Sequence, residues 1–132
     1  MKKNKRSIGA DYERIACEYL QRQGYEILEC NFYSSGGEID IIAKHDGYLV
    51  FVEVKYRRNA SKGYPLDAIS LQKQKTISKC ALYYMKQHSL LNEAVRFDVV
   101  GGWCEPRMSL ERYGLGWQRP CWRFVCLFFG NW

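Results

Sequence analysis

Two acidic residues and a lysine flank an Asp46-Gly47 dipeptide that separates two apolar stretches. Asp-Gly in such a setting is a strong signal for a two-residue β-hairpin turn. Because a tight turn fixes the antiparallel register, Asp40 is expected to face Glu53. Glu38 is then expected to face Lys55. Opposed Cβ atoms in such a ladder lie roughly 4.5–5.5 Å apart, and like charges placed there destabilise each other.

Two interpretations of the Asp40 and Glu53 pair follow from these residue types. A divalent cation such as Mg²⁺, which prefers oxygen ligands, would bridge the two carboxylates. Alternatively, Lys55 would neutralise them and leave an ordinary polar patch. The first interpretation fits phosphodiester hydrolysis, because a lysine beside a metal can orient water and stabilise developing negative charge.

Alternation along the expected hairpin separates its residues into two faces. One face is wholly apolar and is expected to pack against a helix: Ile39, Ile41, Ala43, Val50, Val52 and Val54. The other is apolar near the turn and charged at the far end: Glu38, Asp40, Ile42, Leu49, Phe51, Glu53 and Lys55. A register shift by one residue would bury the charges, so the pattern supports this pairing.

Helical and strand periodicities around the hairpin predict the elements that position these residues. The expected order is a helix between Ser7 and Gly24, strands at 25–33, 38–44 and 48–57, a helix at 65–88 and a strand at 95–100. This order predicts an α/β fold with a mixed sheet flanked by helices.

The composition changes after Val100. All four tryptophans lie beyond it, together with three of the six cysteines, and no lysine does. We therefore expect one α/β domain over residues 1–100. Residues 101–132 are expected to form an atypical Trp- and Cys-rich tail that contains a last strand at about 123–129.

Length and composition restrict the class of protein. A chain of 132 residues fits one domain, and 47% hydrophobic residues argue against disorder. Neither a run of about 18 apolar residues nor the apolar core of a signal peptide is present, so we expect a cytoplasmic protein. The six cysteines form no CxxC pair and are expected to be reduced and mostly buried.

The constellation of Asp40 with Glu53-Val54-Lys55 resembles the PD-(D/E)xK nuclease superfamily, although Ile39 stands where that pattern has its proline. The chain from Gly9 to Val100 is more closely similar to the YraN-type family of bacterial proteins predicted to be endonucleases. That similarity rests on motifs in order: Gly9 and Glu13, Gly24–Leu28, Gly37–Ala43, Leu49–Lys55, the basic helix after Pro65, and Arg96–Val100.

The resemblance implies a restriction-endonuclease-like αβββαβ core and a Mg²⁺ or Mn²⁺ cofactor. It also implies that Glu13 joins Asp40 and Glu53 as metal-binding and catalytic residues, with Lys55 as the catalytic lysine. Glu13 has an alternative interpretation as a solvated glutamate that favours the helix dipole. For Glu38 an ion pair with Lys55 is the favoured interpretation.

Basic residues follow the proposed site and suit contacts with nucleic-acid phosphates. They are Arg57, Arg58, Lys62, Lys73, Lys75 and Lys79, in a chain of net charge +6 and pI near 9.0. A solvated charged surface is an equally good interpretation for each one alone. No base-reading motif is present, so we expect recognition of backbone or shape, and by analogy branched, single-stranded or damaged DNA.

The expected function is a metal-dependent endonuclease that hydrolyses nucleic-acid phosphodiester bonds, with DNA as the partner and no membrane. The first alternative is a non-catalytic nucleic-acid-binding module on the same fold. The second is an assembly protein whose aromatic tail forms an interface.

Overall fold

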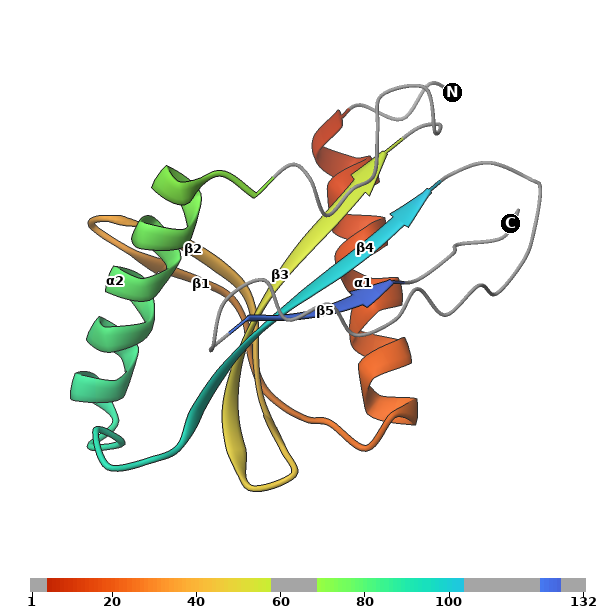
Figure 1. The fold of residues 1–132 in the computed structure, drawn as a ribbon. Coiled ribbons are helices and arrows are strands. Elements are labelled where there is room, and N and C mark those ends of the chain that lie inside the picture. The colour runs from red at the N-terminus through yellow and green to blue at the C-terminus, as the bar shows by residue number, and fades with distance from the viewer. Residues whose placement is uncertain (1–4, 58–68, 104–121, 127–132) are drawn as a thin grey trace.

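The elements follow the expected order and confirm the α/β fold class. The computed structural model describes residues 5–57, 69–103 and 122–126 (Figure 1). Its elements are α1 (Lys5–Arg22), β1 (Glu26–Ser34), β2 (Gly37–His45), β3 (Tyr48–Arg57), α2 (Leu71–Gln87), β4 (Val95–Trp103) and β5 (Trp122–Cys126).

One mixed sheet joins the five strands in the order β1-β2-β3-β4-β5. The first three strands are antiparallel neighbours, whereas β3, β4 and β5 run parallel. Parallel neighbours need a crossover connection, and α2 lies within the one between β3 and β4. Figure 1 shows the β1–β2 hairpin running toward α2 while β3 and β4 extend on the side of α1.

Several element boundaries differ from expectation. The first helix begins at Lys5, so Ser7 lies inside α1 and does not precede it. The second helix begins at Leu71 rather than near residue 65, because the Ser70 side chain caps it by accepting a hydrogen bond from the Lys73 backbone N–H at 3.1 Å. The fourth strand continues past residue 100 to Trp103 through its pairing with β3. A last strand was expected at 123–129, and the structure has β5 at Trp122–Cys126; residues 127–132 lie outside the described residues.

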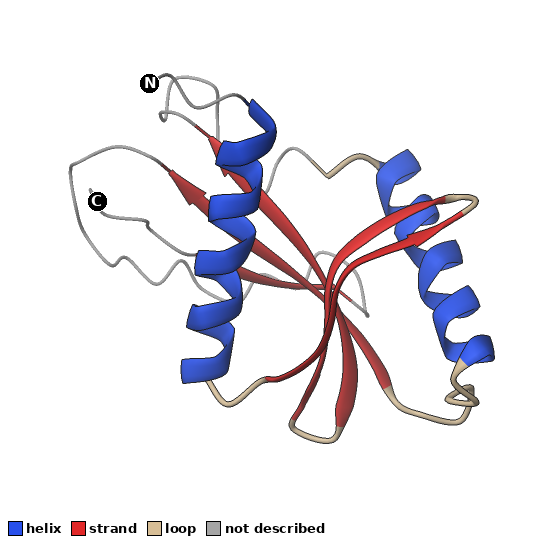
Figure 2. Ribbon diagram, turned by 180° about the vertical axis from the view of Figure 1, so that it is seen from behind, coloured by secondary structure: helices blue, strands red, loops and turns tan. Residues whose placement is uncertain are grey.

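The two helices cover opposite faces of the sheet, as Figure 2 shows from behind. The cluster beneath α1 contains Ala16, Leu20, Tyr25, Ile41, Ala43, Val50, Val52, Val54 and Val100. The cluster beneath α2 contains Phe32, Ile39, Ile42, Leu49, Phe51, Ile77, Cys80, Ala81, Tyr84, Met85 and Val99. Five of the six residues of the apolar hairpin face therefore pack with α1, as the alternation predicts.

Ile39 is the exception, and its expected position was wrong. This fully buried side chain packs in the cluster beneath α2, not with Ile41 and Ala43. Ile39 is the Cα partner of Phe32 on β1, which packs in the same cluster. The end of the β1–β2 hairpin turns toward α2 (Figure 1), so strict alternation does not hold along all of β2.

The β2–β3 turn has the expected conformation. Asp46 (φ 51°) and Gly47 (φ 80°) both have positive φ, as a type I′ turn requires. The register pairs His45 with Tyr48 and continues to Ile41 with Val52. Asp40 with Glu53 and Glu38 with Lys55 were the next pairs expected, and they are not part of this ladder. Moving away from the turn, the pairing of β2 with β3 ends at Ile41 and Val52, and the two strands then separate.

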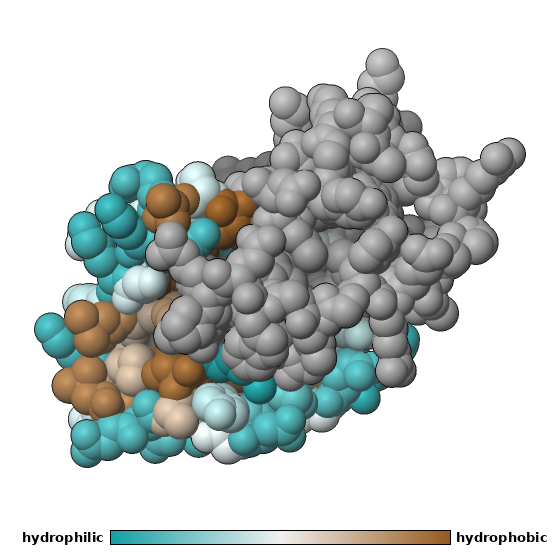
Figure 3. All heavy atoms as spheres, viewed as in Figure 1, coloured by the Kyte–Doolittle hydropathy of each residue, from teal (hydrophilic) through white to brown (hydrophobic). Residues whose placement is uncertain are grey.

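Exposed apolar side chains occur on the outer surface of α2. Leu71, Leu82 and Tyr83 are exposed there, and Figure 3 shows hydrophobic patches on this side of the molecule. Exposed apolar side chains are common on protein surfaces. Within the described residues, neither helix combines the length and the apolar character that a membrane crossing demands.

The cysteines are less buried than expected. Among those with described side chains, only Cys80 is buried, whereas Cys17 is partly exposed and Cys30 is exposed. All three are free thiols. The expectation of mostly buried cysteines was therefore wrong for Cys17 and Cys30; Cys104, Cys121 and Cys126 lie outside the described side chains.

Gly37 sets the distance between β2 and α2, and its replacement should destabilise the protein. A Cβ at this position would clash with Thr76 Cγ2 and lie 3.4 Å from Cys80 Sγ, and the φ of 152° disfavours other residues. We expect Gly37→Ala to lower the free energy of unfolding by about 1–3 kcal/mol, measured by urea denaturation. Gly36→Ala is the matched control, because a Cβ there meets nothing within 4 Å. Equal stability of the two variants would contradict this close packing.

Candidate metal centre

Acidic side chains from three elements converge where β2 and β3 part. Glu13 comes from α1, and Glu38 and Asp40 come from β2. Glu53, from β3, acts on Glu13 and Asp40 through its charge, but its oxygens are not among those that lie mutually close. One carboxylate oxygen from each of Glu13, Glu38 and Asp40 lies within 4.8 Å of the others. The structure thus brings Glu13 to Asp40 and adds Glu38, which sequence reasoning had assigned to an ion pair with Lys55.

The backbone at Asp40 is released from regular pairing. Asp40 is the only residue of β2 without a Cα partner in either neighbouring strand. Its Oδ2 instead accepts a hydrogen bond of 2.8 Å from the Val54 N–H on β3. The Asp40 side chain therefore takes the place of a backbone hydrogen bond of the ladder. It is held against β3 at Val54, the residue that follows Glu53.

Glu53 is a buried carboxylate with only one of its oxygens in an ion pair. The residue is 4% exposed, and its Oε1 lies 3.5 Å from Lys55 Nζ and 3.6 Å from Lys73 Nζ. Its Oε2 is buried and has no hydrogen-bond partner. A buried unpaired polar atom costs roughly 1–3 kcal/mol, and more when it is charged. This oxygen fits a role as a metal ligand, because an oxygen-seeking cation would supply the missing partner.

Crowding of the carboxylates changes their proton affinity. Burial, and then the charge of Glu53, raises the pKa of Asp40 to about 8, against the lowering effect of the Val54 hydrogen bond. Burial and the charge of Glu38 raise the pKa of Glu13, although a hydrogen bond with the Asn31 side chain lowers it. The cluster therefore favours a proton on Asp40 near neutral pH unless a cation compensates the charge.

The two lysines do not neutralise the whole cluster. Within the described part of the chain, Lys55 and Lys73 form ion pairs with Glu53 alone, through the same oxygen. The ion pair expected between Lys55 and Glu38 is therefore replaced by one with Glu53. This follows from the parting of the strands, since Glu38 no longer lies opposite Lys55.

The expected phosphate-binding residues fall into three groups. Lys75 and Lys79 are exposed on α2, as a nucleic-acid contact requires. Lys73 instead points to Glu53 and belongs to the candidate centre. Arg57 is the last residue of β3, and its side chain is not among those described. Arg58 and Lys62 lie outside the described residues.

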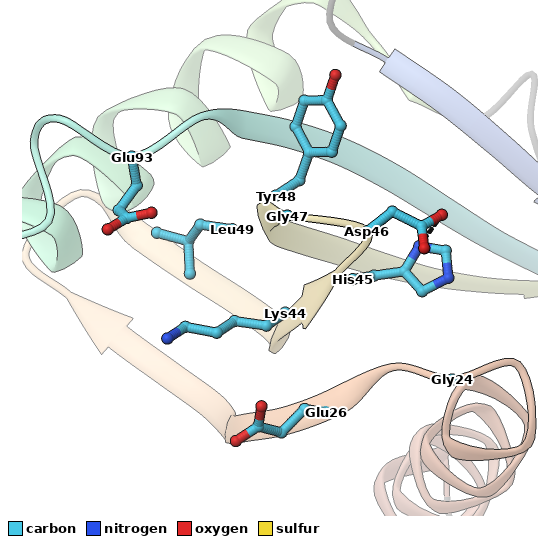
Figure 4. Close-up of a pocket in the computed structure, with 9 residues that line it drawn as sticks. All are labelled: Gly24, Glu26, Lys44, His45, Asp46, Gly47, Tyr48, Leu49 and Glu93. Carbon is cyan, nitrogen blue, oxygen red and sulfur yellow. Dashed lines mark ion pairs between the residues drawn. The ribbon is translucent and has the colours of Figure 1, made fainter.

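A hollow lies at the opposite end of the β2–β3 hairpin from the carboxylates. Figure 4 shows its lining residues around the turn, among them Glu26, Lys44, His45, Tyr48 and Glu93. None of the lining residues belongs to the carboxylate cluster. The hollow and the candidate metal centre are therefore separate features of the hairpin.

A buried polar network next to this hollow was missed by sequence reasoning. Asp98 is fully buried, and it accepts hydrogen bonds from Tyr25 Oη at 2.6 Å and Arg96 Nε at 2.9 Å. Arg96 also contacts His45 Nδ1 at 2.9 Å, and the His45 and Tyr25 rings stack at 3.9 Å. In the sequence, the network is indicated only by the two charged residues, Arg96 and Asp98, within an otherwise apolar strand. The neighbouring residues do not indicate that Tyr25 and His45 are their partners.

The span that matches a known family covers the positions of the candidate centre. Residues 12–101 match the family described as uncharacterised protein family UPF0102. A UPF0102 protein of Lachnoclostridium phytofermentans is 50% identical over 98 residues, which cover 74% of this chain and 83% of the relative. UPF0102 protein TTE1452 of Caldanaerobacter subterraneus subsp. tengcongensis is 40% identical over 114 residues, or 85% of this chain and 93% of the relative.

Proposed function

The chain belongs to the uncharacterised protein family UPF0102, and from its carboxylate and lysine cluster we propose that it is a metal-dependent endonuclease of the PD-(D/E)xK type. The observation that carries the proposal is the buried Oε2 of Glu53, which has no hydrogen-bond partner. A carboxylate that served only as an ion-pair partner for two lysines would have no need for this unpaired oxygen.

We propose that Asp40, Glu53 and Glu13 hold the metal, Mg²⁺ or Mn²⁺, and that Glu38 assists. Such an ion, when bound, stabilises the negative charge that develops on phosphoryl oxygens during hydrolysis. Carboxylate oxygens are the ligands that both ions prefer. Burial, and then the charge of Glu53, raises the pKa of Asp40, and a bound cation would offset this cost of holding the carboxylates ionised.

Lys55 is the proposed catalytic lysine. Its Nζ lies 3.5 Å from Glu53 Oε1 and its side chain is 33% exposed, so the ammonium group can contact both the cluster and a substrate phosphate. From this position Lys55 can orient the attacking water and stabilise the charge that forms on the phosphate.

Nucleic acid is the proposed substrate, with DNA favoured. The net charge of +6 and the exposed Lys75 and Lys79 on α2 support attraction of a polyanion. Selectivity for branched or single-stranded structures is part of the proposal by fold analogy alone. The cytoplasmic location expected from the sequence stays a prediction.

Replacing Lys55 tests the proposed chemistry. We expect the wild type with Mg²⁺ or Mn²⁺ to cleave at least one member of a labelled panel of single-stranded, duplex and branched DNA and RNA. Lys55→Ala should cleave the same substrate about 100-fold more slowly, because a group that stabilises the transition state is lost. Lys44→Ala is the matched control, since Lys44 is an exposed lysine at the other end of the same hairpin.

Three results would contradict the proposal. Equal cleavage by Lys55→Ala and the wild type would remove Lys55 from the mechanism. Cleavage without a divalent ion would remove the metal. Binding of the panel by folded protein that neither binds Mn²⁺ nor cleaves would favour the non-catalytic nucleic-acid-binding module.

A further inference from the structure

Two cysteines far apart in sequence meet between α1 and β1. Cys17 Sγ and Cys30 Sγ lie 3.4 Å apart, although the two residues are 13 positions apart in the sequence. Cys30 is exposed and Cys17 is partly exposed, so small oxidants can reach the pair. We propose that Cys17 and Cys30 form a redox-active dithiol site that a peroxide oxidises to a disulfide.

The geometry allows the bond with little rearrangement. A disulfide needs a sulfur–sulfur distance of about 2.05 Å. The two sulfurs must therefore approach by a little more than 1 Å from their present 3.4 Å. Rotation of the side chains or a shift of α1 toward β1 must supply this approach. Disulfides of cytosolic proteins are commonly transient and redox-sensing, which suits a pair at the surface.

The reaction is balanced with hydrogen peroxide as oxidant. The Cys30 sulfur attacks one peroxide oxygen, the O–O bond breaks, and sulfenic acid and water form after transfer of the thiol proton. Cys17 Sγ then attacks Cys30 Sγ; the S–O bond breaks, and the hydroxyl leaves as water with the Cys17 proton. Two thiols are oxidised to one disulfide while one peroxide is reduced to two waters.

The exposures of the two cysteines assign their roles. Peroxide meets the exposed Cys30 first, so Cys30 is the attacking thiol. Burial, and then the hydrogen bond with Cys30, raises the pKa of Cys17 to about 12. Cys17, the less exposed and less acidic thiol, reacts second as the resolving thiol, and it loses its proton to the departing hydroxyl.

The pair also adjoins the candidate metal centre, and this part of the inference rests on the proposed function. Glu13 precedes Cys17 by four residues on α1, which places both on one face of the helix. Asn31, whose side chain hydrogen-bonds with Glu13, directly follows Cys30. Because Glu13 and Asn31 adjoin the two cysteines, even a limited movement on joining Cys17 to Cys30 would displace Glu13, and we expect the disulfide to weaken Mn²⁺ binding about tenfold.

Mass spectrometry of the full chain tests disulfide formation independently of any metal. Hydrogen peroxide should remove two hydrogens and link the tryptic peptides 15–22 and 23–44, which hold Cys17 and Cys30 respectively. Dithiothreitol should reverse the link. Cys17→Ser and Cys30→Ser should each abolish it; in Cys17→Ser the sulfenic acid on Cys30 should persist and be trapped by dimedone. Single oxidation of the wild-type cysteines without this cross-link would overturn the proposal.

Isothermal titration with Mn²⁺ then tests the coupling. We expect the reduced wild type to bind about tenfold more tightly than the oxidised form, and Cys17→Ser to bind alike before and after peroxide. Equal affinity of both wild-type forms would overturn the coupling but leave the dithiol site in place. If the cross-link forms and neither form binds Mn²⁺, the proposed nuclease function fails while the redox site stands.

Discussion

Asp40→Asn should abolish Mn²⁺ binding and phosphodiester cleavage while making the metal-free protein more stable at pH 8. The amide oxygen of asparagine can still accept the 2.8 Å hydrogen bond from the Val54 N–H, so the local backbone contact is retained. The substitution removes a carboxylate from the crowded cluster with Glu53 and Glu13. The substitution therefore removes the charge repulsion among the carboxylates while it keeps the hydrogen bond to Val54.

The pH dependence of stability follows from the raised pKa of Asp40. In the unfolded chain an aspartate loses its proton near pH 4. In the folded protein the pKa of Asp40 is about 8. Between these values the folded state holds a proton that the unfolded state has lost, so the associated stability is fully present below about pH 4 and is lost as pH rises through 8. Without metal, the wild type should therefore become less stable from pH 5 to pH 8.

Thermal unfolding in a chelator and in Mn²⁺ measures both effects. The wild-type midpoint in chelator should fall over pH 5–8, whereas that of Asp40→Asn should fall less and exceed it at pH 8 by the equivalent of about 1 kcal/mol or more. Mn²⁺ should raise the wild-type midpoint at pH 8, because metal binding requires deprotonated carboxylates. Asp46→Asn, an exposed carboxylate at the hairpin turn, is the matched control and should leave Mn²⁺ binding unchanged.

A purely structural role for Asp40 predicts the opposite pattern. In that case Asp40→Asn would leave Mn²⁺ binding unaltered, or would lower the midpoint at every pH. Either result would remove Asp40 from the proposed metal centre.

Asp98→Ala should destabilise the fold by about 3–5 kcal/mol, the typical result of removing one partner of a buried ion pair. Asp98 is fully buried and receives 2.9 Å hydrogen bonds from both Arg96 Nε and Arg96 Nη2. Burial lowers the pKa of Arg96, but the hydrogen bonds and charge of Asp98 raise it overall. Without Asp98 the guanidinium, whose side chain is 8% exposed, would stay charged without its carboxylate partner.

Urea denaturation provides the measurement. With a slope of about 1–3 kcal/mol per molar urea, the midpoint should fall by at least 1 M. Tyr25→Phe is the graded control: it removes the 2.6 Å hydrogen bond to Asp98 and the 3.1 Å hydrogen bond from Arg96 Nη2, and should cost about 1–2 kcal/mol. Asp98→Ala protein that remains folded should still bind Mn²⁺, because this network does not share residues with the carboxylate cluster. A cost no larger than that of Tyr25→Phe would show that Arg96 finds another partner.

Local chemistry explains what could be predicted. Asp46 and Gly47 form the type I′ turn because their residue types tolerate positive φ, and the turn then set five successive cross-strand pairs correctly. Alternation placed Val50 and Val52 beneath the first helix. A tight turn and the alternation of side chains along a strand depend only on neighbouring residues, so both can be predicted without knowing the fold.

Residues that meet through space could be predicted only in part. Asp40, Glu53 and Lys55 were recognised because they lie on one hairpin, and Glu13 was recognised from the family resemblance. The positions of Glu38 beside Asp40 and of Lys73 beside Glu53 were not predicted. The first depends on where β2 separates from β3, and the second depends on how α2 packs over the sheet.

The sequence by itself determined the order of the elements, the hairpin register near its turn, and the identity of three residues in the candidate centre. Only the tertiary structure decided that the pairing of β2 with β3 ends at Ile41 and that the Asp40 carboxylate accepts a hydrogen bond from the Val54 N–H. It also decided that Cys17 meets Cys30 and that Arg96 and Asp98 are buried with Tyr25. The physical reason is that periodicity and turn chemistry act over a few residues, whereas strand divergence, helix packing and burial of charge depend on contacts between distant parts of the chain.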